Sequence, residues 1–260
     1  MRCSLTGTTL AAVATLLCLS ASIEARINLL DPWFPGQDCW VAKPGTLDTQ
    51  VSFLRGQNFY EIPVSVSYVV DNPLEVGARW GVKDLNNISG IDDLILAMKY
   101  LLLNSVEHKT NICGEAGVQL PTGDPTNGIG TGAVALILHW TMQKLLKEET
   151  GYDLSLLFGL GYTINSENSE KETLGNVFWY HVGCAYDFND YLRFYGELKG
   201  FNHAPYEQSG TVVANSDYQE LYLAPGADIR FKNDLVISSA ILIGLTPQSN
   251  DLGVLISTKF

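Results

Sequence analysis

The stretch from Tyr152 to Tyr162 constrains the fold of this chain more than any other. Its even-numbered residues are all apolar or aromatic, whereas its odd-numbered residues are mostly small or polar. Side chains on a β-strand alternate between two faces, so such a strand has one wholly apolar face with a tyrosine at each end. A tilted strand of about 9–11 residues crosses a bilayer, and aromatic residues mark its interfaces. A half-buried strand of a soluble sandwich shows the same alternation. Whether the pattern recurs along the chain therefore decides between a soluble sandwich and a membrane barrel.

The alternation does recur, almost without interruption, from Thr46 to the end of the chain. Further stretches of this kind are Thr49–Phe53, Ile62–Val70, Leu74–Gly81, Asp93–Leu102, Ile112–Leu120, Ala133–Thr141, Phe178–Phe188, Leu192–Lys199, Glu220–Phe231, Leu235–Leu245 and Leu252–Phe260. Together with Tyr152–Tyr162 they predict about twelve strands in an antiparallel sandwich or barrel. The stretch Leu235–Leu245 is apolar on both faces, so its phase stays open.

The connections between these stretches favour the barrel. Short or modest connections are Asp71–Pro73, Asn104–Lys109, Lys147–Thr150, Asn189–Asp190 and Lys232–Asp234, and they alternate with the longer polar segments Lys83–Gly90, Pro121–Gly130, Asn165–Gly175 and His203–Ser216. Outer-membrane barrels alternate short periplasmic turns with long extracellular loops in this way. Because a sheet in lipid can have no free edge, the first and last strands should pair. We therefore predict an all-β fold, a closed antiparallel transmembrane β-barrel of about 12 strands.

Composition excludes several other classes of protein. Hydrophobic residues make up 46% of the 260 residues, yet outside the first 25 positions no apolar run is long enough for a membrane-spanning helix. The formal net charge of −12 argues against a nucleic-acid partner, which requires a basic surface. The cysteines lack the paired spacing of a zinc site, and no cofactor or metal is predicted.

The amino terminus indicates export. Arg2, the apolar core Leu10–Leu19 and small residues up to Ala25 form the pattern of a cleaved Sec-type signal peptide, residues 1–25. Residues 26–45 are turn-rich and would form a periplasmic or plug segment or a disordered tail, and residues 46–260 would form the barrel. The expected location is the outer membrane of a Gram-negative bacterium. Expected partners are outer-membrane lipid and lipopolysaccharide, a small-molecule solute, and the barrel-assembly machinery through the last strand ending in Phe260.

Inward-facing positions of the predicted strands carry most of the polar residues of the barrel. The lumen-lining set is Glu75, Arg79, Asp93, Lys99, Glu115, His139, His181, Arg193, Tyr195, Glu197, Lys199, Glu220, Tyr222, Asp228 and Arg230, and the phase also places Asp153, Lys83 and Lys259 inside. The charges nearly balance, which predicts a narrow, weakly ion-selective pore. A loop centred near residue 209 would place Lys199 opposite Glu220.

Cysteines and histidines add two narrower expectations. The exported compartment permits a disulfide between Cys39 and Cys113, whereas Cys184 should face lipid as a small hydrophobe. His108 falls in a periplasmic turn. A metal site at His139 and His181 would need ligands converging from different strands, so solvated or hydrogen-bonded lumen histidines are the preferred interpretation.

Three segments resemble a known family. They are Pro73–Lys83, Gly90–Tyr100, and Gly117–Asp124 followed by Gly128–Gly132. They are similar to the outer-membrane barrels described as transporters of the MetA pathway of phenol degradation, over roughly Thr46–Phe260. The resemblance implies a barrel that passes small solutes, aromatic or hydrophobic ones included. It supplies no defining site residues.

Other functions are less well supported. The run Gly128-x-Gly130-x-Gly132 leads into a strand rather than a helix, which is the wrong context for a nucleotide site. An outer-membrane lipase would need a serine near His203, and Ser209 and Ser216 lie in that loop without a nucleophile elbow around them. We therefore predict a channel or transporter, not an enzyme, with a structural barrel without transport as the alternative.

Overall fold

The computed structural model describes residues 44–56, 59–71, 73–85, 88–125, 129–231, 235–249 and 252–259. The predicted signal peptide, residues 26–43 of the predicted plug segment, and Phe260 lie outside the described residues. Among the described residues, no helix is long and apolar enough to cross a membrane.

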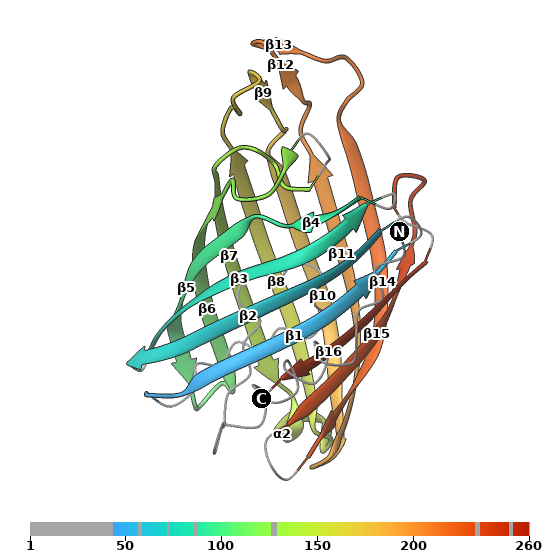
Figure 1. Cartoon of the computed structure of the whole chain (residues 1–260). Coiled ribbons are helices and arrows are strands. Elements are labelled where there is room, and N and C mark those ends of the chain that lie inside the picture. The colour runs from blue at the N-terminus through green and yellow to red at the C-terminus, as the bar shows by residue number, and fades with distance from the viewer. Residues whose placement is uncertain are drawn as a thin grey trace, which may run out of the picture.

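Twelve strands of the described chain form one closed antiparallel barrel, as predicted. They are β1 (Leu47–Arg55), β2 (Phe59–Asp71), β3 (Leu74–Leu85), β5 (Leu94–Ser105), β6 (Thr110–Leu120), β7 (Ala135–Leu145), β8 (Leu154–Asn165), β10 (Val177–Asn189), β11 (Leu192–His203), β14 (Tyr218–Arg230), β15 (Val236–Gly244) and β16 (Leu252–Lys259). Each pairs with its neighbour along the chain, and β1 pairs with β16 from Gln50↔Lys259 to Arg55↔Val254. The strands run tilted around the wall (Figure 1). Closure leaves the sheet without the free edges that lipid would not tolerate.

The remaining elements are small. Strand β4 (Ile88–Ile91) pairs with β3, whereas β9 (Glu172–Thr173), β12 (Glu207–Gln208) and β13 (Thr211–Val212) form a separate three-stranded sheet. This sheet tops one end of the barrel, and helix α2 (Lys147–Thr150) lies at the other (Figure 1). We call the two ends the long-loop end and the short-turn end, because the predicted alternation of connections is present.

Burial follows the predicted alternation but inverts the usual polarity of a protein. In β8, Ser155 and Leu157 are buried, whereas Leu156, Leu160 and Tyr162 are exposed. Other strands expose large apolar side chains in the same way, and the barrel buries lysines, arginines and carboxylates. Charged residues are rarely buried in water-soluble proteins, whereas a transmembrane barrel has an apolar outside and a polar inside. The outer surface is therefore suited to lipid.

Strand β15 resolves the phase that its sequence leaves open. Ala240 and Leu242 are buried, and Ile241 between them is exposed. Ala240 lies opposite Leu255 of β16, which is also buried, so pairing with a clearly alternating neighbour fixes the inner face. An apolar run alone carries no such information.

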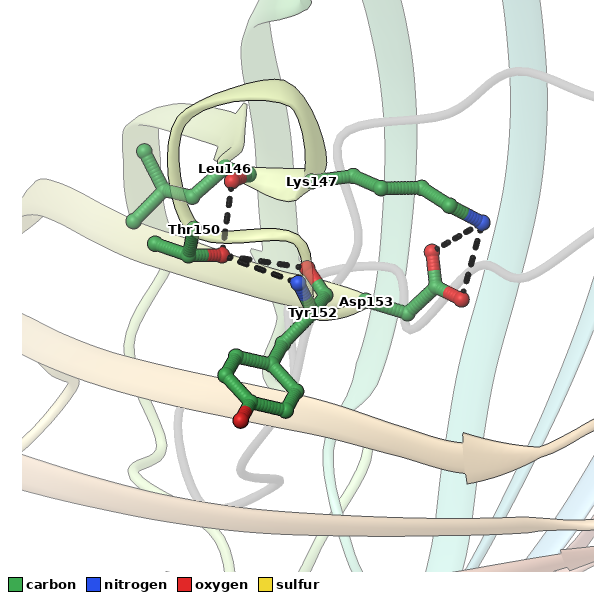
Figure 2. Close-up of polar contacts among 5 residues, drawn as sticks. All are labelled: Leu146, Lys147, Thr150, Tyr152 and Asp153. Carbon is green, nitrogen blue, oxygen red and sulfur yellow. Dashed lines mark hydrogen bonds and ion pairs between the residues drawn. The ribbon is translucent and has the colours of Figure 1, made fainter.

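The turn between β7 and β8 corrects one expectation. Asp153 was expected in the lumen, but it lies outside β8, exposed, with its carboxylate 2.7 Å from Lys147 Nζ. Figure 2 shows this pair beside Thr150, whose hydroxyl donates to the Leu146 carbonyl. Gly151 ends the helix with φ 76, the left-handed conformation that glycine adopts without strain. The strand thus starts two residues later than the alternation from Tyr152 suggests.

Candidate functional site

One side of the barrel interior carries a row of charged side chains in direct register. Glu75, Lys99, Glu115 and His139 face one another in succession across β3, β5, β6 and β7, and all four are buried. We call these four residues the charged row. Lys99 Nζ lies 3.7 Å from Glu115 Oε1, and His139 Nδ1 lies 3.3 Å from Glu115 Oε2. Glu115 therefore joins two partners, and opposite charges on adjacent strands support this register.

A second polar cluster lies on β10 and β11. His181 and Lys199 are directly opposite each other on these two strands. Glu197 lies between them, with Oε1 2.9 Å from His181 Nδ1 and 3.3 Å from Lys199 Nζ. All three side chains are almost fully buried. The Glu197 carboxylate therefore offsets the charge of Lys199 and also lies beside the His181 ring.

Strand β8 allows these two clusters to approach each other. A Cβ atom at Gly159 would lie 1.9 Å from His181 Nε2, and one at Gly161 would lie 2.0 Å from the Trp179 ring. The rings of His139 and Trp179 are 4.3 Å apart between centroids. The small inner face of the stretch Tyr152–Tyr162 thus makes room for large side chains from the strands on either side.

The opposite side of the interior is apolar. Its side chains follow another register row, which we call the apolar row: Ala185, Tyr195, Gly226, Ala240, Leu255 and Leu54. The Tyr195 ring lies over Gly226, and its hydroxyl donates to the Ser239 carbonyl at 3.1 Å. Phe201 and Tyr222 pack edge to face beside this row, 6.3 Å apart. The prediction of a polar lumen missed this wall, although Leu255 already occupies the inward phase of the last predicted strand.

Further ion pairs lie near the two ends of the barrel. Arg230 contacts Asp187 at 2.6 Å near the short-turn end, where Arg193 faces Asp228 across the β11–β14 pair. Lys259 contacts Asp48 at 2.8 Å, which links the closing strands β16 and β1. Arg79 donates to Glu61 at 2.6 Å between β2 and β3. The inward-facing charges are thus extensively paired.

The register between β11 and β14 corrects a predicted contact. Lys199 lies opposite Tyr222 and Glu220 opposite Phe201, so Lys199 and Glu220 are not partners. Glu220 instead lies 3.6 Å from His203, whose ring stacks on Tyr218 at 4.0 Å. The connection is centred between residues 210 and 211 rather than near 209, which shifts the pairing by two residues.

Asp93 has a role that the alternation did not indicate. It precedes β5, and its carboxylate accepts hydrogen bonds of 2.7–2.8 Å from the Gly123 and Thr131 amides, the Thr131 hydroxyl and the Gln119 amide. Gly130 has φ 101, and a Cβ there would lie 2.7 Å from Asp93 Oδ1. One segment that carries the family resemblance, Gly117–Asp124 followed by Gly128–Gly132, therefore ends in a loop wrapped around one carboxylate, which accounts for glycines such as Gly130.

The cysteines fit the exported compartment. Cys113 is fully buried on the inner face of β6 and is disulfide-bonded, with a partner outside the described residues. Cys39, the partner proposed from the sequence, also lies outside them. Cys184 is free and exposed on the outer face, as expected.

A metal site built from three or more protein ligands and a serine hydrolase site find little support in the geometry. Within the described ranges, no group of three or more His, Cys, Asp or Glu side chains is arranged to hold a metal ion. The hydroxyl of Ser216, in the same connection as His203, accepts from the Tyr206 amide at 2.9 Å and donates to the Val213 carbonyl at 2.7 Å. It is thus engaged in shaping its loop, which is not how a serine nucleophile beside a histidine base is held.

Comparison with solved structures places the fold among outer-membrane channels. The chain is similar to an outer membrane channel from Pseudomonas putida F1 with a TM-score of 0.70 at 12% identity, covering 87% of this chain and 98% of that one. It is also similar to the NanC porin, with a TM-score of 0.53 at 14% identity and coverage of 83% and 99%. The KdgM porin matches with a TM-score of 0.53 at 8% identity and coverage of 82% and 98%.

No curated protein matches the sequence. The sequence itself matches a family profile over residues 39–254, and the chain belongs to the family described as "Putative MetA-pathway of phenol degradation".

Proposed function

We propose that this protein is an outer-membrane channel that passes small solutes, aromatic ones in particular, through the barrel interior. The observation that carries the proposal is the two-sided inner wall, with the charged row on one side and the apolar row on the other. A small aromatic molecule with a polar group would contact a ring-lined surface and a hydrogen-bonding surface at the same time. The family description and the likeness to channel structures support the same class of function.

We further propose that conductance is small and only weakly ion-selective. Barrels of eight strands fill their interior with side chains, whereas those of 16–18 strands hold a water channel, and twelve strands lie between these sizes. Long side chains such as Lys99, Arg193 and Lys199 project inward, and most have an acidic partner. Paired charges narrow the path and leave little net field to select ions. The predicted lumen-lining residues would all act here except Asp93, which we assign to the loop.

The proposed setting follows from the outer surface. A continuous apolar exterior suits outer-membrane lipid and lipopolysaccharide, and a signal peptide over residues 1–25 would export the chain. Assembly through the last strand, ending in Phe260, is part of the same proposal.

Flux into liposomes tests the function. Purified protein should admit 4-hydroxybenzoate, a membrane-impermeant aromatic anion, faster than glucose. Phe201→Ala removes a ring from the apolar wall and should reduce the aromatic flux severalfold. Phe194→Ala is the matched control, because Phe194 lies on the same strand but is exposed on the outer face. Flux no greater than in protein-free liposomes would favour a structural barrel, and release of fatty acid from the lipid would favour an enzyme.

A further inference from the structure

Two histidines approach each other inside the barrel from strands that are not neighbours. His139 belongs to β7 and His181 to β10, with β8 between them. Their ring centroids are 5.6 Å apart, and their side chains are 0% and 2% exposed. Burial of two imidazoles this close together is not required by the packing of a barrel wall.

Gly159 of β8 holds open the space between the rings. Its ideal Cβ position lies 1.9 Å from Nε2 of His181 and 3.0 Å from Nε2 of His139. Both nitrogens thus border one point above the glycine, and a side chain at this position would fill the space they share.

The opposite nitrogen of each ring faces a carboxylate. Nδ1 of His139 lies 3.3 Å from Glu115, and Nδ1 of His181 lies 2.9 Å from Glu197. A carboxylate beside Nδ1 favours the tautomer that carries the proton there, which leaves the lone pair on Nε2. We therefore assign two Nε2 lone pairs to the same small space.

These lone pairs are incompletely satisfied. Nε2 of His139 can accept from the Thr141 hydroxyl at 3.0 Å. Although Nδ1 of His181 lies 2.9 Å from Glu197 Oε1, neither ring nitrogen of His181 has a hydrogen-bond partner within the described structure. A buried imidazole nitrogen without a partner is costly, because it has given up its bond to water. An electron-poor atom placed between the rings would remove this cost.

We propose that His139 and His181 bind a transition-metal ion of the class that prefers imidazole ligands, such as Zn²⁺ or Cu²⁺, through their Nε2 atoms. Such ions are commonly held by histidines whose other ring nitrogen faces a carboxylate, as Nδ1 of His139 faces Glu115 and Nδ1 of His181 faces Glu197 here. The chain supplies two imidazoles, so water, the Thr141 hydroxyl or a passing solute completes the coordination. Lys99 and Lys199 already offset the two carboxylates, and we therefore expect weaker binding than at a three-ligand site.

Titration calorimetry of the untagged, folded protein in detergent tests the proposal, with ZnCl₂ and CuCl₂ as probes. One ion should bind per chain, and affinity should fall at least about tenfold in His139→Gln and in His181→Gln. His203→Gln and His108→Gln are the matched controls, because these histidines lie in other parts of the chain and should leave binding unchanged. Gly159→Ala retains both ligands but fills the space between them, and it should also abolish binding.

Electron paramagnetic resonance of the Cu²⁺ form provides a readout that does not depend on variants. The spectrum of the wild-type protein should show coupling of Cu²⁺ to two nitrogen nuclei. This result still tests the proposal if a heat-modifiability gel shows that one of the interior variants does not fold. Absence of saturable binding, an oxygen-only spectrum, or loss of binding in His203→Gln or His108→Gln would overturn the assignment. Each of these measurements is independent of whether the barrel conducts solute.

Discussion

The charged row and the apolar row occupy opposite sides of one barrel and obey the same alternation, yet different interactions hold them. In the charged row, Lys99 and Glu115 are fixed by partners on adjacent strands. In the apolar row, Tyr195 packs on Gly226, and Leu255 meets Leu54 and Ala240. Strand phase therefore decides which side chains point inward, whereas the chemistry of the interior depends on each strand's neighbours.

The two rows also differ in how they tolerate change. An apolar side chain can be shortened at a cost set by the lost contacts and the remaining cavity. A buried ion loses much more when its partner is removed, because an uncompensated charge remains in a medium of low dielectric constant. Substitutions in the charged row should therefore be the more damaging.

The largest loss of stability is expected for Glu115→Ala. It removes the shared partner of Lys99 and His139 and leaves a lysine buried without that compensation. We expect the free energy of unfolding to fall by about 4 kcal/mol, as for other broken buried pairs. Guanidinium unfolding in detergent micelles, followed by tryptophan fluorescence, measures it.

Glu107→Ala is the matched control for this prediction, because Glu107 is exposed in the turn between β5 and β6. It should change the midpoint of unfolding little. Equal losses in Glu115→Ala and Glu107→Ala would contradict the role we assign to the charged row.

The apolar row should respond somewhat less to truncation. Leu255 is 0% exposed, and Leu255→Ala should cost about 3 kcal/mol through lost burial and a residual cavity. Leu252→Ala on the same strand is the control, because Leu252 is 57% exposed on the outer face. The same unfolding measurement applies, and a greater loss in Leu252→Ala would reverse the inside–outside assignment of β16.

A local effect is expected at Asp93. Asp93→Ala removes the acceptor that holds Gly123, Thr131 and Gln119, so the loop over residues 121–134 should loosen while the barrel stays folded. Loss of such hydrogen bonds costs about 1–3 kcal/mol, here confined to the loop. Limited proteolysis should show faster cleavage in this loop than in the wild type.

Asp92→Ala is the control for the loop, because the Asp92 carboxylate accepts only a local hydrogen bond from the Asp93 amide among the bonds described for it. An equal rise in cleavage in both variants would show that the hydrogen bonds of the Asp93 carboxylate do not stabilise the loop. Planar-bilayer recordings of the same proteins would show whether the loop also limits conductance.

These cases also show which parts of the molecule its sequence could predict. Strand β8 was identified from alternation alone, because one face must meet lipid and a one-residue slip would place its apolar residues inside. Closure into twelve strands followed from the same patterns together with the spacing of the turns. Such features depend on residues close together in the chain.

Long-range pairing could not be obtained in this way. Which residue lies opposite Lys199 depends on where the connection between β11 and β14 is centred, and this connection forms its own small strands, β12 and β13. An error of one residue in the predicted centre moved the predicted partner by two residues. Asp93 was assigned to the lumen by phase, whereas its role depends on a loop some thirty residues away. The close approach of His139 and His181 similarly could not be predicted from the sequence, because it depends on β8 lying between their strands with a glycine at position 159.

The smallest effect is expected at the short-turn end, where Lys147 and Asp153 form an ion pair outside the membrane-spanning strands (Figure 2). The hydrogen bond and charge of Asp153 raise the pKa of Lys147 above its ordinary value of 10.5. A raised pKa in the folded state means that the pair stabilises fully below the unfolded pKa, and that this contribution is lost as pH rises through the folded value. Since both side chains are largely exposed, the contribution is small and screened by salt. The wild type should therefore unfold at slightly higher denaturant than Asp153→Asn at neutral pH and low salt, and the difference should vanish at strongly alkaline pH. A difference that grew as the pH rose above 10.5 would contradict the sign of this linkage.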